Sequence, residues 1–239
     1  MAREPRIHYP GALYHVMLRG NGGQDIFLSD SDRTRFFLLI QEGVHRFGNR
    51  IHTFCFMDNH IHLAIQVADI PLSKIIQNIS LRYTRWINDK CRKTGHLFQG
   101  RYKALLVDQD SYLLELVRYI HLNPIRAGLV KHPKNYKWSG HNCYLGEEKL
   151  TWLTTGWVLG QFGEDITTAR HGFARFVNEG IGLLATQLET STMTEVAEYF
   201  QRDISTLSVG IKRIAMKIKS SKEKTSPWSK VLQGFNVKL

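Results

Sequence analysis

Alternating hydrophobic and polar positions predict four short strands in the first half of the chain. These stretches are rich in β-branched and aromatic residues, are bounded by Gly, Asn or Asp, and cover residues 12–19, 50–57, 60–67 and 102–107. Apolar residues at helical spacing between them predict helices over residues 30–47 and 72–90, and a third that carries Leu113, Leu116, Val117 and Ile120. Pro124 lacks an amide hydrogen and is expected to end or kink this third helix.

The order of these elements, β-α-β-β-α-β-α, indicates the α+β class. Two βα units on either side of a tight MDN turn predict a ferredoxin-like (split βαβ) antiparallel sheet with helices packed on one face. This part of the chain is expected to form one domain over residues 1–145.

The pattern changes after Trp138, where several glycines interrupt it. We expect residues 146–190 to be a linker or helical connection. Beyond it, residues 192–195 resemble a capping box and precede two short helices, which predicts a small helix-turn-helix segment over residues 191–239. Six Lys or Arg against one Glu between Lys212 and Lys224 give this segment a basic tail.

The charge of the chain points to a polyanionic partner. Thirty-two Lys and Arg against 21 Asp and Glu leave a net charge of +11, which makes nucleic acid the leading candidate. No apolar run is long enough for a membrane span and the N-terminus has no apolar signal core, so we expect a cytoplasmic, nucleoid-associated protein with no membrane partner. Three scattered cysteines suggest neither a disulfide framework nor a structural zinc site.

A pair of histidines in the third predicted strand forms a candidate metal-binding site. Residues two apart in a strand project from the same face, so His60 and His62 can present two imidazoles to one ion while Ile61 points into the opposite layer. Imidazoles accept magnesium or manganese when oxygen ligands complete the shell. The alternative is a partly exposed polar stripe on a strand.

A tyrosine on the third predicted helix is a candidate nucleophile. Tyr119 lies one turn from both Glu115 and Asn123, so a hydroxyl group and an oxygen ligand for a metal share one helix face. The alternative is a core aromatic residue whose hydroxyl reaches a polar partner, with Asn123 and Pro124 ending the helix.

A basic and aromatic segment separates these two motifs. Between Arg82 and Lys103, seven Lys or Arg stand against Asp89 alone, interleaved with aromatic residues, which is typical of a groove that binds single-stranded nucleic acid. A solvated helix face followed by a loop is the alternative. The candidate DNA-binding residues are Arg82, Arg85, Trp86, His96, Phe98, Arg101, Tyr102 and Lys103.

Five segments in order resemble the REP-associated tyrosine transposases, a branch of the single-tyrosine HUH transposases. They are the opening residues 10–16, MDNHIHL, RYTRWIN, GHLFQGRYK and YLLELVRYIHLNPIRAGLV, and the resemblance covers roughly residues 1–145. It implies a catalytic domain in which His60 and His62 hold one divalent metal, Mg²⁺ or Mn²⁺, and Tyr119 attacks DNA. It also implies that Asn123 is the third protein ligand of the metal, and Glu115 is the alternative ligand. Tyr112 is an alternative nucleophile, but it lies near the start of the helix, without the matching neighbours.

The resemblance further implies a substrate and a product. The substrate would be single-stranded DNA that folds into a hairpin, and attack by Tyr119 would leave a 5′-phosphotyrosine and a 3′-hydroxyl. From the chemistry of the groups themselves, we expect the metal and either Arg118 or His121 to help deprotonate the phenol. A non-catalytic DNA-binding regulator and a metal-dependent RNA nuclease are the alternatives. The oligomeric state stays open.

The C-terminal segment has a resemblance of its own. EVAEYFQRDISTLSVGIKRI is similar to the helix-turn-helix of the replication initiator's DNA-binding domain. This similarity places Arg202, Ser205 and Thr206 at the start of a recognition helix that would reach duplex DNA. Ile204 and Gly210 depart from the pattern, so weakened sequence readout is expected.

Overall fold

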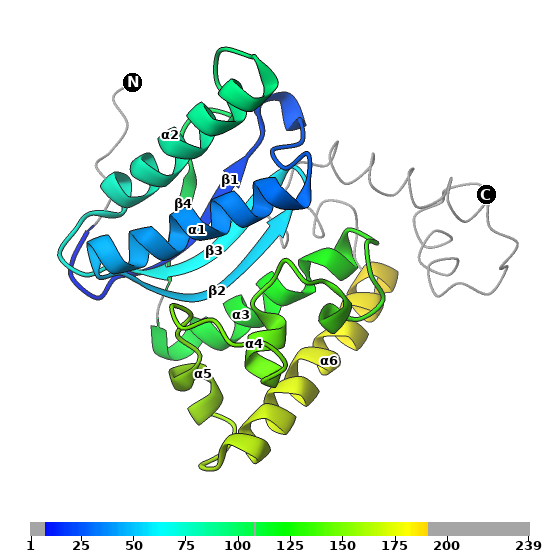
Figure 1. Ribbon diagram of the computed structural model, residues 1–239. Helices are drawn as coiled ribbons and strands as arrows, with labels where there is room; N and C mark the ends of the chain where they lie inside the picture. The colour runs from blue at the N-terminus through cyan, green and yellow to red at the C-terminus, as the bar shows by residue number, and fades with distance from the viewer. Residues whose placement is uncertain (1–7, 108, 191–239) are drawn as a thin grey trace, which may run out of the picture.

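The fold is taken from a computed structural model, which describes residues 8–107 and 109–190 (Figure 1). The expected helix-turn-helix segment, residues 191–239, lies outside the described residues, and so do Arg202, Ser205 and Thr206. None of the helices in the described part of the chain combines the length and the apolar character that a membrane crossing requires.

Four antiparallel strands form the central sheet. They are β1 (Leu13–Arg19), β2 (Arg50–Met57), β3 (His60–Gln66) and β4 (Lys103–Val107), in the order β2-β3-β1-β4. Every neighbouring pair is antiparallel. The prediction of a ferredoxin-like α+β sheet is confirmed, with each strand within one residue of its expected bounds.

Helices α1 (Asp30–Phe47) and α2 (Leu72–Cys91) pack side by side on one face of the sheet (Figure 1). Their apolar stripes bury Phe36 and Tyr83 against each other, with ring centroids 4.9 Å apart. The Tyr83 hydroxyl donates to the carbonyl of Ile26 at 2.7 Å, which satisfies the one polar atom of this buried ring. Gly48, at φ 66°, adopts the left-handed conformation that ends α1.

Helix α3 (Gln109–Arg126) covers the opposite face of the sheet, where it contacts β2 and β3. The expectation that all helices pack on one face therefore holds for α1 and α2 and is wrong for α3. The physical reason is that β2 and β3 are buried on both faces, so each face needs a covering layer. Cys55, Ala64, Leu113 and Val117 meet in this second core.

Three further helices pack around α3. They are α4 (His141–Leu145), α5 (Gly156–Gly160) and α6 (Ile166–Thr190), and two short 3₁₀ helices, Asn21–Gly23 and Pro133–Asn135, lie elsewhere in the chain. Val158, Phe173 and Val177 join the core beneath α3, so the described part of the expected linker or helical connection is helical and packs into the same core. Several of the glycines in this region lie at the ends of short helices; Gly146, at φ 82°, closes α4, and Gly156 and Gly160 are the first and last residues of α5.

Helix α3 does not end at Pro124 but continues to Arg126. Proline removes the amide that would bond to the carbonyl of Ile120, and the side-chain amide of Asn123 approaches that oxygen at 3.5 Å. The same amide donates to the carbonyl of Tyr119 at 3.0 Å. The helix thereby keeps one more turn than the sequence predicts, and this turn carries Arg126.

Candidate active site

His60 and His62 lie on the face of β3 that α3 covers. His62 pairs with Met17 of β1 and His60 with Arg19, while Ile61 belongs to the core on the α1 and α2 side. The two imidazole centroids are 5.0 Å apart. Strand alternation therefore brings the two rings together on one face of the sheet, as the sequence predicts.

Both imidazoles form a contact through their Nδ1 atoms. His60 Nδ1 lies 2.7 Å from Oδ1 of Asn59, in the turn before β3. An amide oxygen only accepts hydrogen bonds, so Nδ1 of His60 carries the proton and Nε2 is the basic nitrogen. His62 Nδ1 lies 2.9 Å from Nε2 of His15. The Nε2 atoms of His60 and His62 are both buried.

The third histidine of this cluster, His15, comes from β1 and is buried. Its ring stacks on His62 with centroids 5.2 Å apart and meets the ring of Tyr119 edge-on at 5.6 Å. Burial lowers the pKa of His15 to about 4, so the ring is neutral at physiological pH. Sequence reasoning missed this residue. The available signal was a histidine within an otherwise apolar run of a predicted strand.

Tyr119 reaches the histidine cluster from α3. Its half-buried ring lies edge-on to His62, with centroids 5.8 Å apart. The guanidinium carbon of Arg126 lies 4.3 Å from the centroid of the Tyr119 ring, and Nη1 of Arg126 donates to the Tyr119 carbonyl at 3.4 Å. Arg126 was also missed, because the helix that presents it was expected to end or kink at Pro124.

The two candidate oxygen ligands have different surroundings. Asn123 is buried and its amide nitrogen bonds back to the helix, whereas Glu115 is exposed and ion-paired with Arg118. Within residues 8–107 and 112–181, no three His, Cys, Asp or Glu side chains form a metal-binding group. Two imidazoles with an amide or phosphate oxygen are a donor set that suits Mg²⁺ or Mn²⁺, so the residues fit such an ion.

His121 and Arg118, which were expected to help deprotonate Tyr119, contact other residues instead. His121 is fully buried in the second core, where its Nε2 lies 2.6 Å from Oγ1 of Thr53 and its Nδ1 lies 3.3 Å from Nδ1 of His141. Arg118 lies over the ring of Phe176 on α6, at 4.3 Å. The suggestion that His121 or Arg118 serves Tyr119 is therefore wrong, and Arg126 is the cation at this ring.

Three aromatic residues expected to stack on bases contact the hydrophobic core, one of them buried and two partly buried. Phe98 is only 8% exposed and packs in the core, 6.3 Å from the ring of Tyr83. Trp86 stacks on Tyr83 at 6.1 Å and has the Lys90 ammonium over its ring at 5.2 Å. Tyr102 packs against the same core. All three rings help to stabilise the fold, and stacking of bases on the partly exposed Trp86 and Tyr102 stays a prediction.

The expected basic groove is divided between the two faces of the sheet. Lys103 pairs with Met17, which pairs in turn with His62, so Lys103 shares the face of the histidine cluster. Arg19, opposite His60, shares it too and was not among the expected residues. Both side chains are exposed, as are Arg85, His96 and Arg101.

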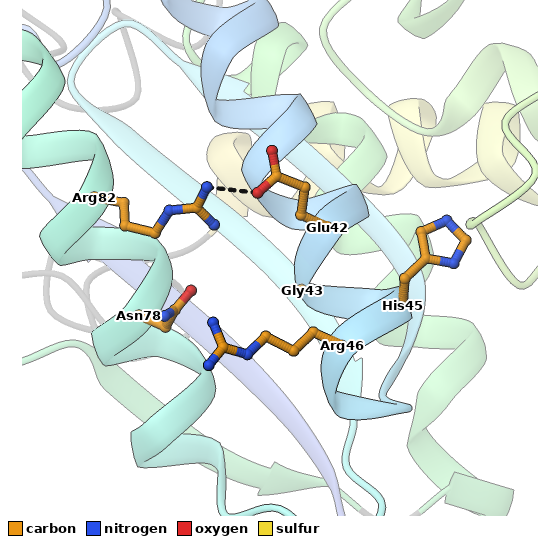
Figure 2. A pocket seen from close by; sticks show the side chains of 6 residues that line it. All are labelled: Glu42, Gly43, His45, Arg46, Asn78 and Arg82. Atoms are coloured by element: carbon orange, nitrogen blue, oxygen red, sulfur yellow. Dashed lines mark ion pairs between the residues drawn. The ribbon is translucent and has the colours of Figure 1, made fainter.

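Arg82 lies on the other side of the sheet, in a pocket between α1 and α2 (Figure 2). The pocket has a volume of about 500 Å³, and Arg82 is ion-paired there with Glu42 at 2.5 Å. Its lining consists of Glu42, Gly43, His45, Arg46, Asn78 and Arg82. Arg82 is thus separated from Tyr119 by the sheet.

Residues 9–123 match the family model described as "Transposase IS200 like". The match begins four residues before β1, ends at Asn123 on α3, and includes all three histidines of the cluster and Tyr119. This part of the chain belongs to the IS200-like transposase family. Members of such a family cut and transfer DNA, which assigns that general activity to the domain.

One solved structure supports the fold of this transposase. A REP-associated tyrosine transposase bound to a REP hairpin matches 64% of this chain and 98% of its own at 14% identity, with a TM-score of 0.53. A crystal structure of a transposase-like protein from Deinococcus radiodurans matches 50% of this chain and 95% of its own at 13% identity, but its TM-score of 0.36 supports no conclusion. No curated protein sequence gives a significant match.

Proposed function

We propose that this transposase cleaves and rejoins hairpin-containing single-stranded DNA through a 5′-phosphotyrosine formed on Tyr119. In this proposal His60, His62 and Asn123 bind one Mg²⁺ or Mn²⁺. The observation that carries it is the convergence of Tyr119 with His62, whose rings lie 5.8 Å apart although they come from a helix and a strand distant in the sequence. A protein that only binds DNA would have no need for this arrangement.

The reaction follows from the groups that meet there. The Tyr119 oxygen attacks the scissile phosphorus in line, its proton leaves, and the bond from phosphorus to the 3′-oxygen breaks, which gives a phosphotyrosine and a 3′-hydroxyl. The metal, when bound, supplies positive charge that polarises the phosphate. Arg126 over the phenol ring favours the negative charge that develops on it. A later attack by another 3′-hydroxyl reverses the step and rejoins DNA without ATP.

Two features support DNA as the partner. Arg19 and Lys103 place exposed cations on the face of the histidine cluster, where they can contact phosphates. The structurally similar REP-associated transposase is bound to a REP hairpin, which makes a hairpin the substrate to test first. Contact with duplex DNA through Arg202, Ser205 and Thr206 stays a prediction.

The test is a denaturing gel of the full-length protein mixed with labelled hairpin oligonucleotides and Mg²⁺ or Mn²⁺. We expect a covalent band with the wild type and with Tyr112→Phe, which alters an exposed hydroxyl on the same helix. Tyr119→Phe should abolish the band while leaving DNA binding within a few-fold of the wild type. A full-strength adduct in Tyr119→Phe would refute the role of Tyr119. Binding without any adduct would favour a regulator, and RNA cleavage without an adduct would favour a nuclease.

A further inference from the structure

His15 connects the two halves of the candidate active site. Its Nε2 lies 2.9 Å from Nδ1 of His62, its ring stacks on His62, and its edge meets the ring of Tyr119. The three rings therefore form one cluster that joins β1, β3 and α3. Both His15 and His62 are less than 10% exposed, so bulk water cannot readily replace their mutual contact.

The direction of the hydrogen bond between His15 and His62 decides whether His62 can bind a metal through Nε2. A histidine that binds a metal through Nε2 carries its proton on Nδ1 and needs an acceptor there. Asn59 supplies that acceptor for His60. For His62 the atom in the same position is Nε2 of His15, which accepts when His15 carries its own proton on Nδ1.

We propose that His15 is a positioning residue that accepts the Nδ1 proton of His62 and thereby holds its Nε2 lone pair in the orientation needed for metal binding. This proposal rests on the proposed function. Acceptors of this kind typically change metal affinity by about 10–100-fold when they are removed. Because His15 also packs against Tyr119, it fixes the nucleophile and the metal ligand relative to each other.

Two substitutions of His15 by side-chain amides of different length distinguish a positioning role of this residue from a role in packing alone. The side-chain amide of glutamine extends as far from the backbone as the Nε2 atom of histidine, so His15→Gln keeps an acceptor near His62. The amide of asparagine is one carbon shorter and matches Nδ1 instead, so His15→Asn leaves the Nδ1 proton of His62 without its acceptor. His15→Leu removes every polar atom while it fills the site.

The first measurement is long-range ¹H–¹⁵N NMR of histidine-labelled, metal-free full-length protein, with the His62 signals assigned through His62→Gln. We expect His62 of the wild type and of His15→Gln to be protonated on Nδ1. In His15→Asn and His15→Leu this tautomer should lose its dominance. A His62 protonated on Nε2 in the wild type overturns the proposal, and this result requires no substitution to fold.

The second measurement is Mn²⁺ binding by calorimetry to the same proteins. We expect the dissociation constant to rise about 10–100-fold in His15→Asn and His15→Leu and to stay within a few-fold of the wild type in His15→Gln. Equal affinities in all four proteins overturn the proposal. If the wild type forms no DNA adduct, the proposed function fails, whereas the tautomer of His62 still decides the role of His15.

Discussion

At the scale of single residues, Arg126 should control the reactivity of Tyr119. Its guanidinium carbon lies 4.3 Å from the phenol centroid, and a cation–π contact of about 1–2 kcal/mol there holds the ring in position beside His62. Arg126→Gln should therefore slow single-turnover adduct formation about 5–30-fold, and Arg126→Lys should slow it less. Lys131→Gln is the matched control, because it removes an exposed cation five residues later. If Arg126→Gln and Lys131→Gln slowed adduct formation equally, the effect would come from the net charge of the protein and not from the contact of Arg126 with Tyr119.

Some of these residue roles follow from local sequence and others do not. The shared face of His60 and His62 is fixed by the two-residue period of a strand, which is a local property. His15 becomes part of the site only because β1 pairs with β3, and that pairing is not visible in either segment alone. Arg126 depends on a helix that continues past Pro124, against the usual effect of proline.

At the scale of elements, a pair of buried histidines joins α3 to α4 and should make the fold sensitive to acid. His141 of α4 faces His121 of α3, which lies against Thr53 of β2. Burial lowers the pKa of His141 to about 4, whereas an unfolded histidine titrates near 6.5. Protons therefore bind the unfolded chain first as the pH falls.

The expected result is a loss of stability between about pH 6.5 and pH 4. The free energy of unfolding should fall over this range by about 3 kcal/mol on account of His141 alone, and change little from this source above pH 7. His141→Asn should flatten the curve obtained from urea unfolding at a series of pH values. His132→Asn, at an exposed position, should leave it unchanged. A wild-type slope in His141→Asn would contradict this account.

Sequence patterns are sufficient to predict some of the helices and strands but not others. Strands and the first two helices are bounded by strong signals and match the predicted ranges within one residue or so. The glycines after Trp138 suggested a linker or helical connection between two domains. Gly146 instead ends a five-residue helix, and Phe173 of α6 stacks on Tyr144 of α4 with centroids 4.5 Å apart. Only the packing against α3 shows that these pieces belong to the same core.

At the scale of the whole molecule, the sheet separates two basic surfaces. One surface carries Arg19 and Lys103 on the side of the histidine cluster. The other carries Arg82 in the pocket between α1 and α2, on the far side of the sheet (Figure 1, Figure 2). A DNA strand with a phosphate beside Tyr119 lies next to the surface that carries Arg19 and Lys103. We therefore expect this surface, and not the one with Arg82, to contribute strongly to DNA binding at the active site.

This separation predicts different effects for three substitutions of equal charge. Arg19→Ala and Lys103→Ala should each weaken binding of a hairpin oligonucleotide and reduce the slope of log affinity against log salt by about 0.7, the value for one contact to a single-strand phosphate. Arg82→Ala should change both much less, because Arg82 is already paired with Glu42 and lies on the opposite face. Fluorescence anisotropy over a salt series measures both quantities. If Arg82→Ala reduced the slope as much as Lys103→Ala, the DNA would have to contact both faces of the sheet, and a path confined to the α3 side would be wrong.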